Sequence, residues 1–252
     1  HAFDNGWDVQ FDVERREGEM DGYLLYFSGF PDKETGTGLG TSPNHYVADR
    51  EQTSVRFLAS GPFELFGREH QLTAGALHSK QTVDSVSYGT NDPITVPSIF
   101  DWGNGVEPVD FNQTPNYSTF ESYKQQGIYA AAQLSLTDEL TTIIGNRLTT
   151  YETTVESPFS PSDFKHSGVN TPYFGIVYDI SDIISTYASY TEIFKPQSAI
   201  DANFELVGPV EGSNTEIGIK GDFFNEALTA SFAVYKVKED NLAITDPDAA
   251  EP

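Results

Sequence analysis

The chain has 252 residues, a formal net charge of −24 and no cysteine. The acidic charge excludes a basic stripe that would bind nucleic-acid phosphates, and the lack of cysteine excludes disulfides, thiol catalysis and thiolate metal sites. No run of eighteen apolar residues occurs, which excludes a transmembrane helix, whereas a membrane β-barrel keeps its mean hydropathy low because its strands alternate apolar and polar residues.

Alternation with a period of two predicts strands along much of the chain. The clearest case begins at Trp7, where Val9, Phe11 and Val13 follow on one face and acidic or amide side chains occupy the other. The same period returns in residues 124–136, 140–149, 173–180, 216–223 and 228–235. A helix would need a period of 3.6. We therefore predict an all-β protein, an antiparallel transmembrane β-barrel segment of about ten strands.

The predicted links between strands alternate in length. Short links are expected near residues 17–22, 61–68, 137–139, 181–183 and 224–226, and long ones at 30–45, 83–120, 156–167, 196–211 and in the tail after Asn241. Outer-membrane barrels have short periplasmic turns and long external loops, whereas a soluble sandwich mixes loop lengths at both ends. An open sheet edge cannot lie in hydrocarbon, so we expect further strands outside this segment to complete the barrel.

Two groups of residues are candidates for a site. Aromatic rings crowd the longest predicted link and would line a ligand pocket or pack as a loop core: Tyr88, Phe100, Trp102, Phe111 and Tyr117. Arg147 and Lys220 are predicted to face the lumen, where they would pair with interior carboxylates or contact an internal plug.

Motifs for catalysis or metal binding do not occur. The five histidines are scattered without an HExxH motif, and the GTGLG run at Gly36 lacks dinucleotide-binding spacing. Asp201, Asn203 and Glu205 are spaced like early calcium ligands, but the glycine and the final glutamate of an EF-hand are not at the required offsets. We predict no catalytic residue, no protein metal ligand and no covalently bound cofactor.

Four stretches resemble the barrel of TonB-dependent ferric-siderophore receptors, especially the ferric-coprogen and ferripyoverdine branch. They are SGPFELFGREHQLTAGA from Ser60, GIYAAAQLSLTDELTTIIGNRLTTYE from Gly127, TPYFGIVYDISDIISTYASYTEIFKPQ from Thr171 and EGSNTEIGIKGDFFNEALTASFAVYKVKEDNLA from Glu211. Together they cover under half of the chain, and the last two are specific to the family rather than typical of barrels in general.

The resemblance implies a 22-stranded barrel plugged by an N-terminal domain, the strand count of plugged transporters. Residues 1–252 would be a partial barrel domain, without the plug, the TonB-binding box or the last strands. The implied ligand is an Fe(III)-siderophore held at external loops and plug. Its iron would stay coordinated by the siderophore, and import into the periplasm would require the TonB complex.

This resemblance implies a receptor in the outer membrane of a Gram-negative bacterium, in contact with outer-membrane lipid and with no enzymatic activity. A TonB-dependent importer of another solute, such as a glycan or another metal complex, is an alternative with the same architecture. A soluble β-rich binding module is a third hypothesis, which exposed aromatic residues would also fit. The acidic charge argues mildly against an anionic chelate.

Overall fold

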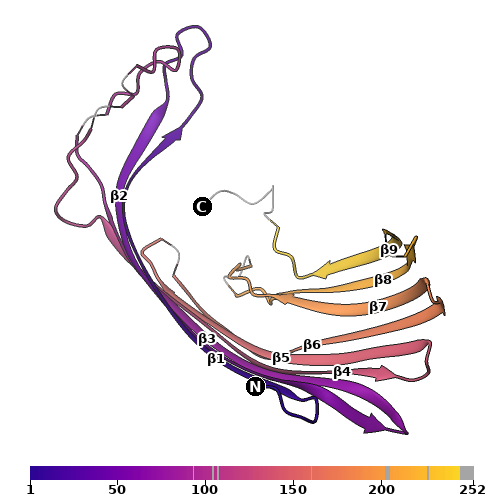
Figure 1. Cartoon of the computed structure of the whole chain (residues 1–252). Helices are drawn as coiled ribbons and strands as arrows, with labels where there is room; N and C mark the ends of the chain where they lie inside the picture. Colours follow the sequence, from indigo (N-terminus) through magenta and orange to yellow (C-terminus); the bar gives the residue numbers. More distant parts are fainter. Residues whose placement is uncertain are drawn as a thin grey trace.

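The computed structural model describes residues 1–92, 94–103, 105–106, 108–159, 161–201, 205–225 and 227–244. Within them, nine antiparallel strands form one curved sheet in which each strand pairs with its neighbours along the chain (Figure 1). The strands are β1 (Asp8–Ser28), β2 (Gly40–Leu65), β3 (Arg68–Tyr88), β4 (Tyr117–Ser135), β5 (Leu140–Glu156), β6 (Ser162–Ser181), β7 (Ile184–Lys195), β8 (Val210–Phe223) and β9 (Leu228–Asp240). The part of the chain described contains no helix able to span a membrane.

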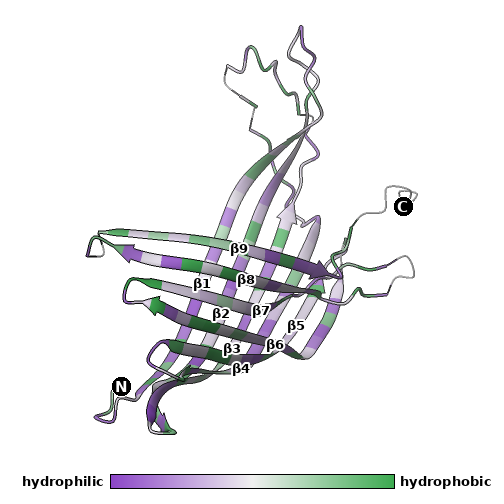
Figure 2. Cartoon of the chain, turned by 90° about the vertical axis from the view of Figure 1, so that its right-hand side faces the viewer, coloured by the Kyte–Doolittle hydropathy of each residue, from purple (hydrophilic) through white to green (hydrophobic). Residues whose placement is uncertain are grey.

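Hydrophobic and hydrophilic residues alternate along the strands (Figure 2). Because successive side chains of a strand point to opposite faces, the two faces of the sheet differ in polarity. One face, here called the outward face, presents exposed apolar side chains such as Phe11, Ile128 and Ile217. Directly paired residues continue this face from strand to strand, as in the row of Phe57, Ala76, Ile128 and Leu148. The other, inward face carries polar residues such as Asp12, whose carboxylate accepts a hydrogen bond from Arg56 at 3.0 Å. A barrel wall has this division, with apolar residues toward lipid and polar residues toward the lumen.

A hydrophobic core of the kind that stabilises a soluble sandwich is not found in the described residues, where the buried apolar side chains are Ala48, Val83, Phe164 and Val210. Most of the exposed large apolar residues of the strands lie instead on the outward face. Burial of that face in lipid accounts for its composition.

The predicted link at residues 17–22 is wrong, whereas the nine strands found in the described residues agree with the prediction of about ten. β1 runs without interruption from Asp8 to Ser28 and pairs with β2 at every position. Its polar middle is held by exposed ion pairs, including Arg15 with Glu17 at 2.6 Å and with Glu51 at 3.3 Å. In this middle part of β1 both faces of the sheet carry polar residues, so the sequence shows no apolar alternation. The backbone pairing of β1 with β2 nevertheless continues through it.

The connections alternate in length as predicted, with narrower bounds. The short turns at 66–67, 136–139, 182–183 and 224–227 lie at one end of the sheet, here called the short-turn end. The connections at 29–39, 89–116, 157–161 and 196–209 lie at the other, the long-loop end. The first two are shorter than predicted because β1, β2 and β3 extend beyond their apolar segments, and the third because β6 begins at Ser162. The extension of β1, β2 and β3 rises past the other strands (Figures 1 and 2).

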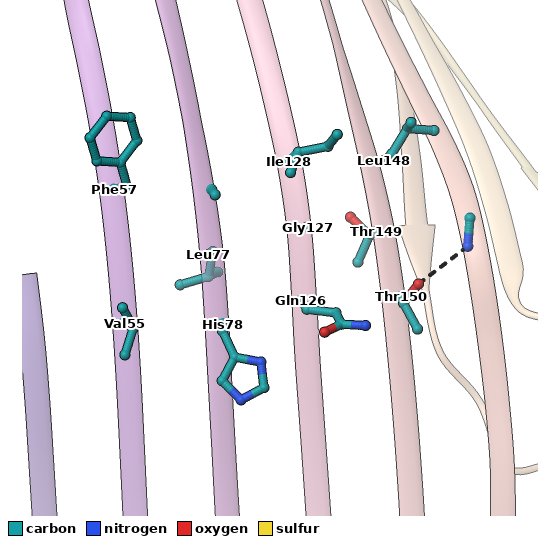
Figure 3. Close-up of a pocket in the computed structure, with 12 residues that line it drawn as sticks. Val55, Phe57, Leu77, His78, Gln126, Gly127, Ile128, Leu148, Thr149 and Thr150 are labelled. Atoms are coloured by element: carbon teal, nitrogen blue, oxygen red, sulfur yellow. Dashed lines mark hydrogen bonds between the residues drawn. The ribbon is translucent and has the colours of Figure 1, made fainter. Parts of the chain in front are cut away.

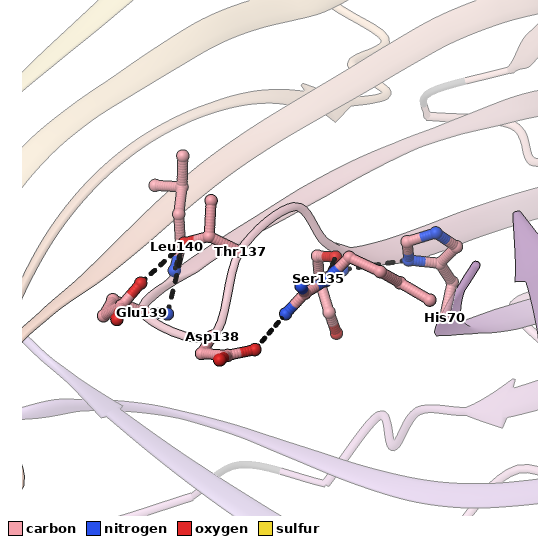
Figure 4. Close-up of polar contacts among 7 residues, drawn as sticks. His70, Ser135, Thr137, Asp138, Glu139 and Leu140 are labelled. Atoms are coloured by element: carbon pink, nitrogen blue, oxygen red, sulfur yellow. Dashed lines mark hydrogen bonds and ion pairs between the residues drawn. The ribbon is translucent and has the colours of Figure 1, made fainter. Parts of the chain in front are cut away.

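Hydrogen bonds join two neighbouring turns at the short-turn end (Figure 4). His70 is 4% exposed, and its Nδ1 accepts the Ser135 backbone N–H at 3.0 Å while its Nε2 lies 3.1 Å from the Leu65 carbonyl oxygen. Arg68 donates to the Ser135 carbonyl at 2.9 Å and forms an ion pair with Asp138. His70 therefore fixes the end of β4 against the turn between β2 and β3.

Glycine and tyrosine are directly paired three times across neighbouring strands of the inward face: Gly75 with Tyr129, Gly145 with Tyr173 and Gly218 with Tyr187. In each pair the tyrosine ring occupies the space of the missing side chain. A Cβ on Gly145 would lie 2.1 Å from Cζ of the Tyr173 ring, and a Cβ on Gly218 would lie 2.6 Å from that of Tyr187. Such aromatic cover compensates for glycine in a strand.

Candidate functional site

Two loops lie at the end of the extension of β1, β2 and β3 and contact each other. They are residues 29–39, here called the first loop, and residues 89–116, here called the second loop. The Ile99 N–H donates to the Gly36 carbonyl at 2.9 Å, and the Ser98 hydroxyl donates to the Thr35 carbonyl at 2.6 Å. Gly36 has φ +69°, and a Cβ there would lie 2.5 Å from the Ser98 hydroxyl and 2.7 Å from the Phe100 ring. Glycine is thus required at position 36 both by backbone conformation and by the close approach of the second loop.

Asp32 organises the first of these loops. Its Oδ1 accepts hydrogen bonds from the backbone N–H and hydroxyl of Thr35, at 2.8 and 2.9 Å, and from the Glu34 N–H at 3.0 Å. These bonds, with the Thr35 N–H the largest contributor, hold the pKa of the Asp32 carboxyl below its ordinary value. The loop is therefore tied around an ionised aspartate at neutral pH.

An aromatic cluster joins the long second loop to the extended strands. Tyr23, His45 and Tyr88 are directly paired neighbours on β1, β2 and β3, and the His45 ring stacks on both of the others at centroid distances of 4.5 and 5.2 Å. Phe111 lies 5.4 Å from Tyr23 and 5.7 Å from His45. His45 Nε2 also lies 2.7 Å from Oδ1 of Asp21.

A cavity of about 340 Å³ lies beside this cluster, between the second loop and the β1–β2 hairpin. Its lining is mainly apolar and consists of Tyr23, Leu24, Leu25, Pro43, Ile94, Val106, Pro108, Val109 and Phe111. A concave, largely apolar surface of this size is suited to holding part of a small ligand.

The five predicted aromatics do not form one pocket. Tyr88 and Phe111 join the cluster, whereas the Trp102 ring contacts Phe27 at 5.4 Å. Phe100 packs over Gly36, and the Tyr117 ring meets Phe159 edge to face at 4.8 Å. The five side chains also differ in solvent exposure. Phe100 is 66% and Trp102 40% exposed, whereas Tyr88, Phe111 and Tyr117 are half-buried.

Sequence reasoning missed the partners of these aromatics. Tyr23, Phe27 and His45 lie on extended strands, and alternate residues 23, 25 and 27 are all apolar or aromatic in the sequence. This alternation is the sequence signal that could have identified Tyr23 and Phe27. The direct pairing of Tyr23 with His45 depends on a register that no local pattern specifies.

Arg147 and Lys220 lie on the inward face, paired with Thr171 and Ser185 respectively. Arg147 Nε donates to Thr149 Oγ1 at 3.1 Å. Among the described residues no carboxylate lies within 4.0 Å of either cation, so their pairing with interior carboxylates or contact with a plug stays a prediction.

The described residues hold no group of three or more His, Cys, Asp or Glu side chains arranged to bind a metal ion.

Comparison with known families decides the class of protein. The family model described as TonB dependent receptor-like, beta-barrel matches residues 1–251. This chain belongs to the β-barrel family of TonB-dependent receptors. The predicted family and fold class are confirmed.

Individual relatives agree with this assignment. The ferric-pyoverdine BN7/BN8 receptor of Pseudomonas putida is 33% identical over 97% of this chain and 32% of its own length. The ferrioxamine B receptor of Salmonella typhimurium is 26% identical over 98% of this chain and 35% of its own. The crystal structure of the Pseudomonas aeruginosa ferripyoverdine receptor bound to ferripyoverdine superimposes with a TM-score of 0.88, 30% identity and coverage of 98% of this chain and 32% of that one. The chain spans about a third of the length of these relatives.

Proposed function

We propose that this TonB-dependent receptor segment is part of the wall of an outer-membrane receptor that binds an Fe(III)-siderophore at its external loops and imports it into the periplasm. The observation that carries the proposal is the likeness to the ferripyoverdine receptor, which extends over 98% of the chain. The receptor would act with the TonB complex and without chemical catalysis, and the siderophore would supply all ligands to the iron. A pyoverdine-type siderophore is the first candidate.

At the long-loop end we assign two different roles to the five predicted aromatics, ligand contact and loop packing. Phe100 and Trp102 are the exposed pair, and we assign them to contact with the ligand. Tyr88, Phe111 and Tyr117 are half-buried against other rings, so their role is to hold loops 89–116 and 157–161 in place. Rigid aromatic faces bind a planar or apolar part of a ligand with little loss of conformational entropy.

The test is uptake of radioactive iron by a strain that lacks this gene and its paralogues, complemented with the full-length receptor. Iron-55 supplied as ferripyoverdine should enter only with the receptor and an intact TonB. Trp102→Ala should raise the half-saturating concentration, whereas Phe66→Ala, which removes a 94% exposed ring at the short-turn end, should not. Uptake of ferrioxamine B instead would change the ligand assignment, and the absence of iron uptake from any siderophore would refute the proposal in favour of another solute.

A further inference from the structure

The wall of the sheet opens between β6 and β7 toward the long-loop end. These two strands pair only from Tyr173 with Thr191 to Ser181 with Ile184. Beyond Tyr173, residues 162–172 of β6 adjoin β5 on one side, and no described residue pairs with their other edge. Toward the long-loop end β6 stays beside β5 and β7 stays beside β8 (Figure 1). This opening is here called the β6–β7 seam.

Two features of the β6 sequence keep the seam open. Ser167 and Gly168 oppose the single residue Thr150 of β5, which is a β-bulge, and a bulge bends and twists the strand that carries it. Gly168 has φ +65°, and its N–H donates to the Thr150 hydroxyl at 3.4 Å (Figure 3). Pro172, directly before the last residue paired with β7, has no N–H to donate, and proline within a sheet is confined to free edges, strand starts and bulges. This part of β6 therefore has the sequence of an edge strand.

The seam lies above the lipid-facing band of the sheet. On its short-turn side the outward face carries exposed apolar residues such as Phe174 and Ile217. Beside the seam the outward residues include polar ones from each of β6 to β9: Asn170, Glu192, Ser213 and Lys238. Unpaired backbone groups are not tolerated in hydrocarbon, but they are where water reaches them. The seam therefore opens on the external side, where the long loops also lie.

A cavity of about 270 Å³ occupies the seam. Its lining comes from both faces of the wall. Thr171 and Ile193 belong to the inward face, whereas Asn170 and Glu192 belong to the outward face. A ligand in the lumen therefore has access to this cavity through the wall itself.

The charged groups of this cavity favour a cation. Its lining includes the carboxylates of Glu192, Glu211 and Asp240 and one ammonium group, that of Lys238, which gives a formal charge of −2. Lys238 Nζ lies 2.6 Å from Asp240 and neutralises it. Glu192 accepts a hydrogen bond from the Tyr190 hydroxyl at 2.7 Å. No cationic side chain among the described residues lies within 4.0 Å of Glu192 or Glu211, so both can pair with a cation from outside.

Two buried polar atoms beside the seam have no hydrogen-bond partner among the described residues: Nε2 of His166 and Oδ1 of Asn214. The His166 ring reaches across the seam and meets Phe194 edge to face at 5.8 Å. Asn214 is paired with Thr191, the residue at which the β6–β7 pairing ends. Buried polar groups are normally satisfied. With the free edge of β6, these atoms offer hydrogen bonds that the described part of the chain does not use.

We propose that the β6–β7 seam is a subsite for a ferric chelate that carries a pendant amide chain with a cationic amine. This subsite rests on the proposed function, because the chelate is the one that the receptor would import. Amide groups of the chain would pair with the backbone edge of β6 at residues 169–171, as an added strand does. The ammonium group would lie between Glu192 and Glu211. The unpaired backbone thus selects an amide chain, and the two carboxylates select its positive charge.

The experiment compares chelates with and without this charge, bound to the detergent-purified full-length receptor. One pair of probes is a ferripyoverdine with one lysine in its peptide, native and acetylated on the lysine amine. The other pair is ferrioxamine B, native and acetylated on its terminal amine. Acetylation removes the positive charge and leaves the iron ligands unchanged. In each pair that binds, the native form should bind about tenfold more tightly, the size of one charge-assisted hydrogen bond.

Variants and hydrogen exchange assign this preference to the seam. E192Q/E211Q should bind the native and acetylated forms alike. The matched control is E64Q/E69Q, which removes two directly paired, exposed carboxylates at the short-turn end and should keep the preference. N170W fills the cavity without changing any charge and should weaken binding of the native form. Backbone amides of residues 162–172 should exchange more slowly when the native chelate is bound, which tests the strand pairing separately from the charge.

The possible outcomes separate the subsite from the proposed function. Equal affinity of the native and acetylated forms in every pair that binds would overturn the subsite and leave the proposed function in place. The same holds if E64Q/E69Q loses the preference as fully as E192Q/E211Q, or if the bound chelate leaves exchange in residues 162–172 unchanged. If neither pair of chelates binds, the proposed function fails and the subsite fails with it.

Discussion

The three glycine–tyrosine pairs of the inward face lead to a quantitative prediction at Gly145. In Gly145→Ala the new methyl group would lie 2.1 Å from Cζ of the Tyr173 ring and 2.3 Å from its hydroxyl. The ring must leave the wall, because Gly145 is buried in the sheet and the backbone cannot move away. Overpacking of this kind costs about 1–3 kcal/mol, so the free energy of unfolding should fall by that amount.

The measurement is guanidinium unfolding of the full-length receptor in lipid vesicles, in a double-mutant cycle with Tyr173→Ala. Without the ring the methyl group has space, and Gly145→Ala should then be neutral or stabilising by about 0.5 kcal/mol because alanine restricts the unfolded chain. Gly18→Ala is the control, since a Cβ on that strand glycine would have no atom within 4 Å. An equal loss from Gly145→Ala with and without the Tyr173 ring would refute the reasoning.

Three further predictions concern the turns and loops. Gly36→Ala should release the second loop from the first, because of both clash and strain at φ +69°, and should make residues 89–116 more sensitive to protease. The pKa of the Asp32 carboxyl is lowered in the folded loop. The stabilisation of the loop by this carboxylate is therefore present above the ordinary pKa of 3.8 and is lost as the pH falls through the folded pKa. Trp102 fluorescence should report this loss in the wild type but not in Asp32→Asn. His70→Phe should destabilise the receptor by about 1–3 kcal/mol in guanidinium unfolding, since it leaves the N–H of the half-buried Ser135 without its acceptor on His70.

Each of these predictions has a contrary outcome. Unchanged proteolysis of Gly36→Ala would show that the loops do not depend on their mutual docking. A fluorescence transition of the same size in Asp32→Asn would assign the acid response to another carboxylate. Wild-type stability of His70→Phe would mean that water or a shifted backbone satisfies the Ser135 amide.

The strands could be predicted from sequence wherever lipid imposes a strict alternation. Residues 140–149 and 228–235 alternate because one face meets hydrocarbon, and both are strands. The middle of β1 could not be identified in this way, because around Arg15 and Glu17 both faces of the ladder are polar and the composition resembles a turn. The lengths of the first two long links were overestimated for the same reason, because the polar ends of β1, β2 and β3 also lack the apolar alternation.

The candidate site was predictable only in part. The abundance of rings in residues 88–117 drew attention to the longest loop, but not to the strands against which it packs. Tyr23 and His45 are distant in sequence and meet through strand register. Arg147 and Lys220 could be placed on a face by alternation, but alternation does not specify which groups they contact.

The length of β2 sets how far its hairpin stands from the membrane. It has 26 residues, of which positions 55–63 carry its apolar outward segment and positions 40–53 continue beyond it. At about 3.4 Å per residue and a tilt of roughly 45°, the hairpin tip rises roughly 30 Å above the hydrocarbon edge. The Debye length in physiological salt is about 8 Å. Capture of a solute at the tip should therefore be governed by the charge of the loops themselves and be insensitive to the charge of the lipid surface below.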